Sequence, residues 1–420
     1  MLQSVVRRAS FLALATAAGQ GIILLVTPWL ARQYTPAEFG ALALLLSIAN
    51  ISTAIGCLRF DLAILGAPDE DVVPLAKLAM LSAVASSLLG GSIVGVGLAA
   101  RVRALSALTE VPAPAVLAAC CVLAAALTQL LAARLMRDNR FGPLAALRVL
   151  PGAGFAVATP TFLGLLWGFA VSLVSGLFAA LWGSRWLMQA PSTGRSVREV
   201  LRRHWRFPLL SLPGALLDVV GYSLCVWFIT SSFGAQEAGR YAQVQRVLGA
   251  PLMLASLSLG QVYLRRSAEM VGDPGELRRL TVRLFGLLVL GLGLMLLAIA
   301  IAGPVVLGAL LGDGWRVDRA FLVAIGVASG VRASVSPVTN VLVTLRRLDL
   351  AISWQAGYFC CAMLVLGTAS RQVPFLTFIG IYAVHEAVLY TIYLALVLVA
   401  LRDHADGRPI PGSKPSPVGT

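Results

Sequence analysis

The strongest constraint on the fold of this chain is a series of long apolar runs that follow one another with only short polar breaks. A hydrocarbon core about 30 Å thick requires about 20 apolar residues of any helix that crosses it. Transmembrane β-strands alternate in polarity over about 10 residues, whereas these runs are longer and uniformly apolar. The sequence therefore predicts an all-α polytopic membrane protein with about 12 transmembrane helices. The predicted spans are 11–31, 39–58, 74–100, 112–133, 142–162, 163–184, 208–231, 241–263, 284–302, 320–344, 350–369 and 374–401.

The distribution of charge predicts how these spans are oriented. Only 12% of the residues are charged, against about 25% in an ordinary soluble domain. A net charge of +14 would suggest a nucleic-acid partner in a soluble protein, but here most of the lysines and arginines fall on one side of the predicted membrane. Cytoplasmic loops of membrane proteins carry such an excess. We therefore expect both termini in the cytoplasm and no nucleic-acid partner.

A short stretch near the start of the chain recurs about half the chain length later. The stretch 35–41 (TPAEFGA) aligns with 234–240 (GAQEAGR), and each follows one apolar run and precedes another. This pattern indicates an internal duplication of the chain into two pseudo-symmetric halves of six helices each. Since each half holds an even number of spans, the repeat is parallel. The predicted divisions are an N-lobe at 1–190, a basic cytoplasmic linker at 191–207, a C-lobe at 208–402 and a disordered cytoplasmic tail at 403–420.

The linker between the predicted lobes contains a basic segment with two interpretations. Val197 to Trp205 carries several arginines between apolar residues. It suits an amphipathic helix on the anionic cytoplasmic leaflet, and it equally suits a solvated linker. The sequence by itself does not favour either interpretation.

The motifs of several enzyme classes are missing. The chain has no Gly-x-x-x-x-Gly-Lys-Ser/Thr loop, so it does not bind ATP in that way. Asp69-Glu70-Asp71 resembles an acidic triplet of some glycosyltransferases, but acidic residues at a helix N-terminus are the favoured interpretation. The three histidines and six cysteines have no metal-ligand spacing. We therefore expect no enzyme activity, no cofactor and no metal.

Charged side chains inside the predicted spans are the candidates for function. Such residues cost a few kcal/mol in a bilayer, so they normally face a bundle interior or a wet cavity. Arginines outnumber acids among them, and a guanidinium binds phosphate bidentately, which favours an anionic substrate. Arg59 and Arg148 lie close enough to the cytoplasmic side to be snorkelling anchors instead. The other charged candidates are Asp61, Asp218, Arg246, Arg332 and Glu386.

Several stretches resemble the lipid-linked oligosaccharide flippases, a polysaccharide biosynthesis family of the multidrug/oligosaccharidyl-lipid/polysaccharide exporter superfamily. The resemblance lies in 30–40 (LARQYTPAEFG), 58–64 (LRFDLAI), 207–208 (FP), 239–241 (GRY), 246–251 (RVLGAP) and 261–262 (QV). It implies two six-helix lobes, a central cationic cavity and alternating access. It also implies that arginines contact the substrate diphosphate, at Arg32, Arg59 and Arg246. Arg332 is added because it lies about halfway along its span.

The resulting hypothesis is a flippase of the bacterial inner membrane. It moves an undecaprenyl-diphosphate-linked oligosaccharide, a repeat unit of O-antigen, capsule or exopolysaccharide, from the cytoplasmic to the periplasmic leaflet. Asp61, Asp218, Gln261 and Glu386 are candidates for glycan contacts or ion coupling. The partners expected are the lipid-linked glycan, membrane lipids, a glycan polymerase and export proteins, with a monomeric transport unit. The alternatives are a cation-coupled multidrug antiporter of the same superfamily and a membrane-embedded glycan polymerase or ligase.

Overall fold

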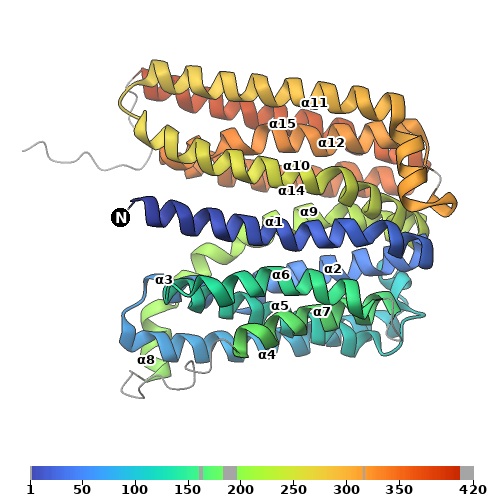
Figure 1. The fold of residues 1–420 in the computed structure, drawn as a ribbon, viewed down its shortest axis with the longest axis horizontal. Coiled ribbons are helices and arrows are strands. Elements are labelled where there is room, and N and C mark those ends of the chain that lie inside the picture. Colours follow the sequence, from blue (N-terminus) through green and yellow to red (C-terminus); the bar gives the residue numbers. More distant parts are fainter. Residues whose placement is uncertain (1, 160–163, 183–195, 316, 407–420) are drawn as a thin grey trace, which may run out of the picture. The chain divides into compact units, whose positions relative to one another are not determined.

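The computed structural model describes residues 2–159, 164–182, 196–315 and 317–406, and these residues form helices joined by short turns (Figure 1). The first helices of the chain are α1 (Leu2–Gln33), α2 (Pro36–Gly56), α3 (Phe60–Gly66), α4 (Asp69–Ala99), the 3₁₀ helix η1 (Arg103–Leu108), α5 (Pro114–Arg137), α6 (Phe141–Ala158), α7 (Gly164–Trp182) and α8 (Val197–His204). The later ones are α9 (Arg206–Phe233), α10 (Ala235–Glu269), α11 (Pro274–Leu311), η3 (Asp313–Trp315), α12 (Arg319–Thr339), α13 (Val341–Thr344), α14 (Leu348–Gln372) and α15 (Phe375–Ala405).

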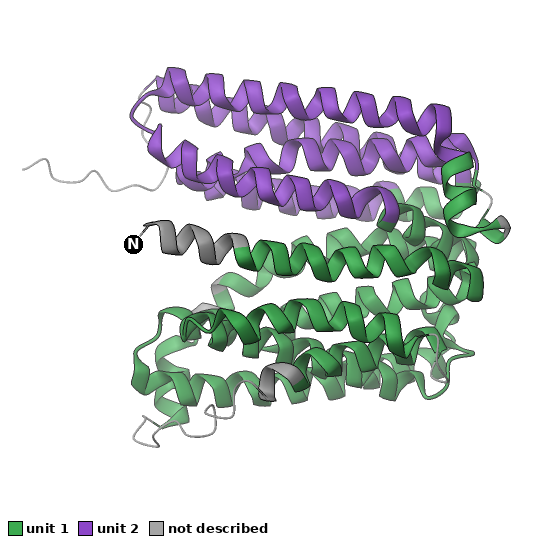
Figure 2. Cartoon of the chain, viewed as in Figure 1, with its two compact units in different colours: residues 1–246, 305–317, 366–375 green, residues 247–304, 318–365, 376–420 purple. Residues whose placement is uncertain are grey.

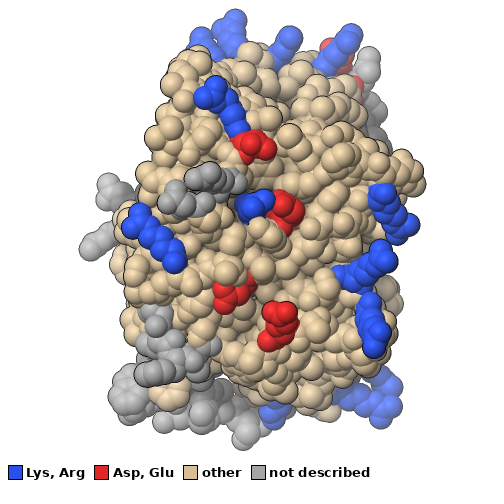
Figure 3. Space-filling model, turned by 90° about the vertical axis from the view of Figure 1, so that its right-hand side faces the viewer, with Lys and Arg blue, Asp and Glu red and all other residues tan. Residues whose placement is uncertain are grey.

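The helices confirm the prediction of an all-α membrane protein with about 12 spans. Eleven of them are long and apolar enough to cross a membrane, and Gly164–Phe178 is a shorter apolar helix. Large apolar side chains are exposed along α4 and α11, among them Leu88 and Leu294. Figure 3 looks at the helices end-on and shows Lys, Arg, Asp and Glu side chains as separate groups among other residues on that face. Lipid can cover the exposed apolar side chains of α4 and α11, whereas water cannot do so without cost.

The described chain forms two compact units (Figure 2). Unit 1 comprises residues 1–246, 305–317 and 366–375, and unit 2 comprises residues 247–304, 318–365 and 376–420. This grouping differs from the two predicted lobes, because unit 1 also takes α9, the start of α10 and two short later segments. The lobes and the linker stay predictions, and 183–195 and 407–420 lie outside the described residues. Residues 403–405, predicted to belong to the tail, are the last residues of α15.

Unit 1 is built from helix pairs that pack along their length. α6 packs against α7 and α1, α4 against α5, and α2 against α5 and α9. The later segment 305–317 joins this unit through Trp315, whose indole nitrogen donates to the carbonyl of Ala31 at 2.7 Å. The ring of Trp315 also meets Phe39 edge-on at 5.2 Å between centroids. Segments from both halves of the sequence therefore contribute to one core.

The two stretches of the internal repeat meet each other in unit 1. A methyl group built on Gly40 of α2 would collide with the backbone carbonyl of Ala235, and one built on Gly239 of α10 would collide with the carbonyl of Pro36. The alignment of the two stretches pairs Gly40 with Gly239 and Pro36 with Ala235. The contact is therefore reciprocal, as at a twofold axis, where the same patch appears on both sides. This geometry supports the duplication, and only glycine allows the helices to come this close.

Unit 2 has its own core near the ends of several helices. Tyr263 of α10 and Leu277 of α11 are buried with residues of α13 and α15, such as Val341 and Val397. The hydroxyl of Tyr263 hydrogen-bonds that of Thr281 at 2.6 Å. Burial of both apolar surface and satisfied polar groups stabilises this unit.

The short helix α8 packs against the first turn of α4. The acidic triplet Asp69-Glu70-Asp71 forms that turn, as expected for acidic residues at a helix N-terminus. The Asp71 carboxylate is fully buried and lies 3.1 Å from His204 Nε2 and 3.5 Å from Arg203. Val200 is buried in the adjoining apolar cluster. This part of the linker is thus an amphipathic helix, docked on protein through one side.

Candidate functional site

The predicted site residues fall into separate polar groups within the two units. Arg246 lies on α10 and Arg59 with Asp61 at the turn between α2 and α3, all in unit 1. Arg332 and Glu386 lie on α12 and α15 in unit 2.

Arg246 is a half-buried guanidinium in the first half of a membrane-spanning helix. Its Nη1 atom is buried and has no hydrogen-bond acceptor among the residues that the structure describes. One residue earlier, Gln245 donates from Nε2 to the Tyr222 hydroxyl of α9 at 3.2 Å. An arginine with an unused donor inside a span is costly unless a wet cavity or a ligand supplies the acceptor. Arg246 is therefore equipped to bind an anion.

Two further donors on α10 are also unused. Gln243 is 1% exposed, and neither its Nε2 nor the Nε of Arg240 has an acceptor among the described residues. Arg240 does use Nη1, which donates to Glu237 at 2.8 Å. The three side chains are spaced three residues apart, so they form a continuous row along the helix. At a rise of 1.5 Å per residue the row spans about 9 Å. No sequence motif marks Gln243, and its spacing from Arg246 is the signal that could have found it.

The turn between α2 and α3 and the start of α3 hold one basic and one acidic side chain, Arg59 and Asp61. Arg59 has a left-handed backbone (φ 62°) and caps the start of α3, and its buried Nε has no acceptor within the described chain. Asp61 is 1% exposed, and its Oδ2 accepts from Gln129 of α5 at 2.8 Å. Burial raises the pKa of the Asp61 carboxyl, although the Gln129 hydrogen bond and the charge of Arg59 oppose this effect. This carboxyl is therefore easier to protonate than an exposed aspartate.

Arg332 in unit 2 is already paired. Its Nη2 and Nε donate to Glu386 Oε2 at 2.7 and 3.2 Å, and its Nη2 also donates to the Tyr358 hydroxyl at 3.0 Å. That hydroxyl donates in turn to Glu386 Oε1 at 2.6 Å. The guanidinium lies 5.6 Å from the ring centre of Tyr390, and Glu386 is fully buried. The network balances the charge of Arg332 inside the protein.

The remaining predicted residues lie in more open places. Arg32 is exposed, and its Nη2 donates to the carbonyl of Ala309 near the end of α11 at 3.0 Å. Such a contact satisfies a carbonyl that the helix leaves free. Asp218 on α9 and Gln261 on α10 both have exposed side chains. None of the described residues form a metal-binding cluster of three or more His, Cys, Asp or Glu.

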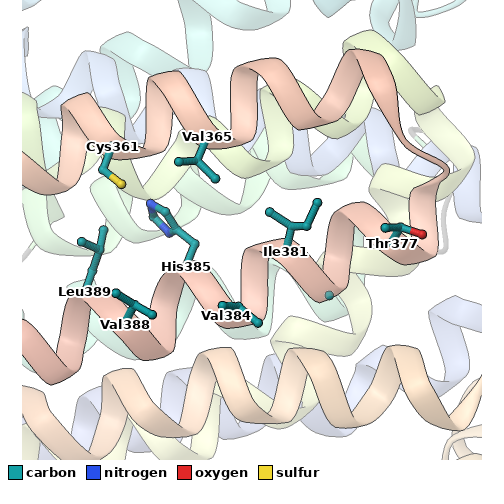
Figure 4. A pocket seen from close by; sticks show the side chains of 9 residues that line it. Cys361, Val365, Thr377, Ile381, Val384, His385, Val388 and Leu389 are labelled. Carbon is teal, nitrogen blue, oxygen red and sulfur yellow. The ribbon is translucent and has the colours of Figure 1, made fainter.

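An apolar groove of about 570 Å³ lies between α14 and α15 in unit 2 (Figure 4). Its lining is mostly aliphatic, and none of the predicted arginines reaches it. The His385 ring projects into the space beside Cys361 (Figure 4), and its Nδ1 atom lies 3.4 Å from Glu386 Oε1. A lining of this kind suits hydrocarbon, so the groove is not the place for a charged head group.

Comparison with known proteins shows which family and which solved structures this chain resembles. A model of a family described as polysaccharide biosynthesis protein matches residues 29–318. No curated protein matches the sequence. Among solved structures, the chain is similar to the lipid II flippase MurJ in an inward closed conformation, with a TM-score of 0.70, 10% identity and coverage of 94% of this chain and 89% of that chain.

Two transporters of another kind show the same likeness. An inward-facing multidrug resistance MATE family transporter of the MOP superfamily has a TM-score of 0.64 and 13% identity, with 94% of this chain and 99% of that chain covered. The eukaryotic MATE transporter AtDTX14 has a TM-score of 0.57 and 15% identity, with 96% and 98% covered. At these identities the likeness shows a shared fold.

Proposed function

Since the chain belongs to the polysaccharide biosynthesis protein family, we propose that it is a flippase for a polyprenyl-diphosphate-linked oligosaccharide. The substrate class is the undecaprenyl-diphosphate-linked repeat unit of a bacterial surface polysaccharide. The protein moves the head group from the cytoplasmic to the periplasmic leaflet of the inner membrane, with both termini in the cytoplasm. Its partners are the lipid-linked glycan and the surrounding lipids.

The observation that carries this proposal is the unpaired guanidinium of Arg246. Its buried Nη1 lacks an acceptor among the described residues, and a phosphate oxygen is the acceptor that a guanidinium fork binds best. Arg332 is a poorer candidate because Glu386 already neutralises it. A cationic drug would be repelled by Arg246, which argues against the multidrug alternative.

Transport follows from binding in two alternating orientations of the protein. Arg246 holds the diphosphate inside the membrane, where water is scarce and charged hydrogen bonds are strong. The polyprenyl tail stays in the bilayer while the head crosses. An inside-negative potential favours outward movement of a negative head by about 2.3 kcal/mol per charge per 100 mV.

The test is flux of a fluorescent undecaprenyl-diphosphate oligosaccharide across proteoliposomes. We expect wild-type protein to transport it and Arg246→Gln to reduce the rate about 10- to 100-fold, because a hydrogen bond to a charged group contributes about 1.5–3 kcal/mol. Arg371→Gln, on the last turn of α14, serves as the matched control and should transport normally. Wild-type protein that exports cationic dyes and does not transport the glycolipid would overturn the proposal.

A further inference from the structure

The face of α10 that meets α2 at Gly239 carries polar side chains further along the helix. Positions 239, 243 and 246 are separated by four and three residues, so they lie on one side of the helix. Gly239 fixes the direction of that side, because it packs against Pro36 of α2. Gln243 and Arg246 therefore share the face that Gly239 presents to α2.

The equivalent positions on α2, in the first copy of the repeat, show that the fold does not require polar side chains on this face. Extending the repeat alignment along α2 pairs Gln243 with Leu44 and Arg246 with Ser47. Leu44 is fully buried, and the Ser47 hydroxyl donates to the carbonyl of Leu44 within its own helix. The equivalent face of α2 is thus apolar or internally satisfied. The two polar side chains on α10 need another explanation.

Gln243 is costly in the structure as it stands. It is 1% exposed, and its Nε2 has no acceptor within the described residues. Leaving a buried donor unsatisfied costs about 1–3 kcal/mol, and more where no water is present. Its neighbour Gln245 does not share this cost, because it donates to Tyr222. A residue that lowers stability in this way is expected at a binding site.

We infer that Gln243 and Arg246 together bind the two phosphates of the diphosphate, so that Gln243 determines selectivity for a diphosphate over a monophosphate. Side chains three residues apart on a helix have Cβ atoms about 5–6 Å apart, which suits two adjacent phosphates. Arg246 supplies the charge, and the Gln243 amide donates to an oxygen of the second phosphate. This inference rests on the proposed function and names the residue that recognises the second phosphate.

The experiment is equilibrium binding of radiolabelled farnesyl diphosphate and farnesyl monophosphate to the full-length protein in detergent. These probes carry no sugar, so the identity of the glycan does not matter. We expect the wild type to prefer the diphosphate. Gln243→Met should weaken diphosphate binding about tenfold, which corresponds to about 1.4 kcal/mol, and leave monophosphate binding unchanged. Arg246→Gln should weaken both, and the control Gln245→Met should weaken neither.

Thermal unfolding without ligand separates binding from a structural role. Gln243→Met removes an unsatisfied donor and keeps the side-chain volume, so its melting temperature should equal or exceed that of the wild type. Gln243→Glu gives a second variant that removes the donor and repels phosphate, and it should bind the diphosphate more weakly still.

Three outcomes would overturn the inference. A Gln243→Met protein that melts well below the wild type would assign the residue to the fold. A stable Gln243→Met protein with unchanged diphosphate preference would overturn the inference alone and leave the flippase proposal standing. A wild type that binds neither probe would overturn both.

Discussion

Arg246 and Arg332 both lie in membrane-spanning helices, and their surroundings are opposite. Arg332 donates to Glu386 and Tyr358 and so forms part of a closed network. Arg246 keeps a buried donor without an acceptor among the described residues. A paired charge inside a membrane protein stabilises the structure it belongs to, whereas an unpaired one is available to a ligand. The two arginines should therefore respond differently to substitution.

The largest expected effect is on stability, at Arg332. Arg332→Gln leaves the Glu386 carboxylate fully buried without its counter-ion, and breaking a buried pair costs about 3–5 kcal/mol. Chemical or thermal unfolding in detergent measures the loss. Arg246→Gln is the matched comparison and should unfold like the wild type. If both variants lost the same unfolding free energy, Arg332 and Arg246 could not be distinguished as a paired and an unpaired arginine.

For transport we expect the opposite order, with the larger loss at Arg246. Arg246→Gln should lower the transport rate by the equivalent of about 1.5–3 kcal/mol. For Arg332 the suitable variant is the double substitution R332L/E386L, since replacing a whole buried ion pair by apolar residues is often neutral for stability. We expect this double variant to move the glycolipid at nearly the wild-type rate in proteoliposomes. A folded R332L/E386L protein without transport would show that the pair takes part in substrate movement.

A smaller effect is expected at Tyr358, which bonds Arg332, and at Tyr222, which accepts from Gln245, the residue before Arg246. Tyr358→Phe removes the hydroxyl that joins Arg332 to Glu386, at a cost of about 1–2 kcal/mol in unfolding free energy. Tyr222 in unit 1 is 50% exposed, so Tyr222→Phe should change the unfolding free energy by less than about 0.5 kcal/mol. Parallel unfolding curves measure both. Similar losses at the two positions would mean that unit 1 has a network as closed as that of unit 2.

The smallest effect is a pH dependence at Asp61, beside Arg59. Because burial raises the pKa of this carboxyl, the folded state holds the proton more tightly than the unfolded state. Asp61 therefore contributes stability below its ordinary pKa of about 3.9, and that contribution is lost as the pH rises through the raised folded value. Asp61→Asn should remove this part of the slope in a plot of melting temperature against pH. An unchanged slope would show that the Arg59 charge controls Asp61 more than burial does.

The fold was predictable to a large extent because a bilayer restricts the choice. Long apolar runs can only become spanning helices. Several helices extend beyond the predicted spans, as α11 (Pro274–Leu311) does at both ends of 284–302, but the polar breaks hold the residues that start and end helices. Thr35 and Glu38, for example, form a capping box at the start of α2, and Gly234 ends α9 with a positive φ of 90°. The repeat signal was short, and the reciprocal packing of Gly40 and Gly239 supports it.

The site was less predictable because its chemistry depends on partners that are distant in the sequence. Arg332 and Glu386 are separated by 54 residues, and nothing near either one indicates that they pair. Gln243 was one glutamine among several in the predicted spans, and only its burial and its unused donor distinguish it.

The sequence alone determined that this protein folds in a lipid bilayer, about how many helices span it and that arginines outnumber acidic residues inside those helices. These properties follow from the composition and length of each segment, which are local. The tertiary structure decided which arginine is neutralised and which keeps a donor for a ligand. That outcome depends on which helices pack together, and helical periodicity fixes the face of a residue without fixing the neighbour that it meets.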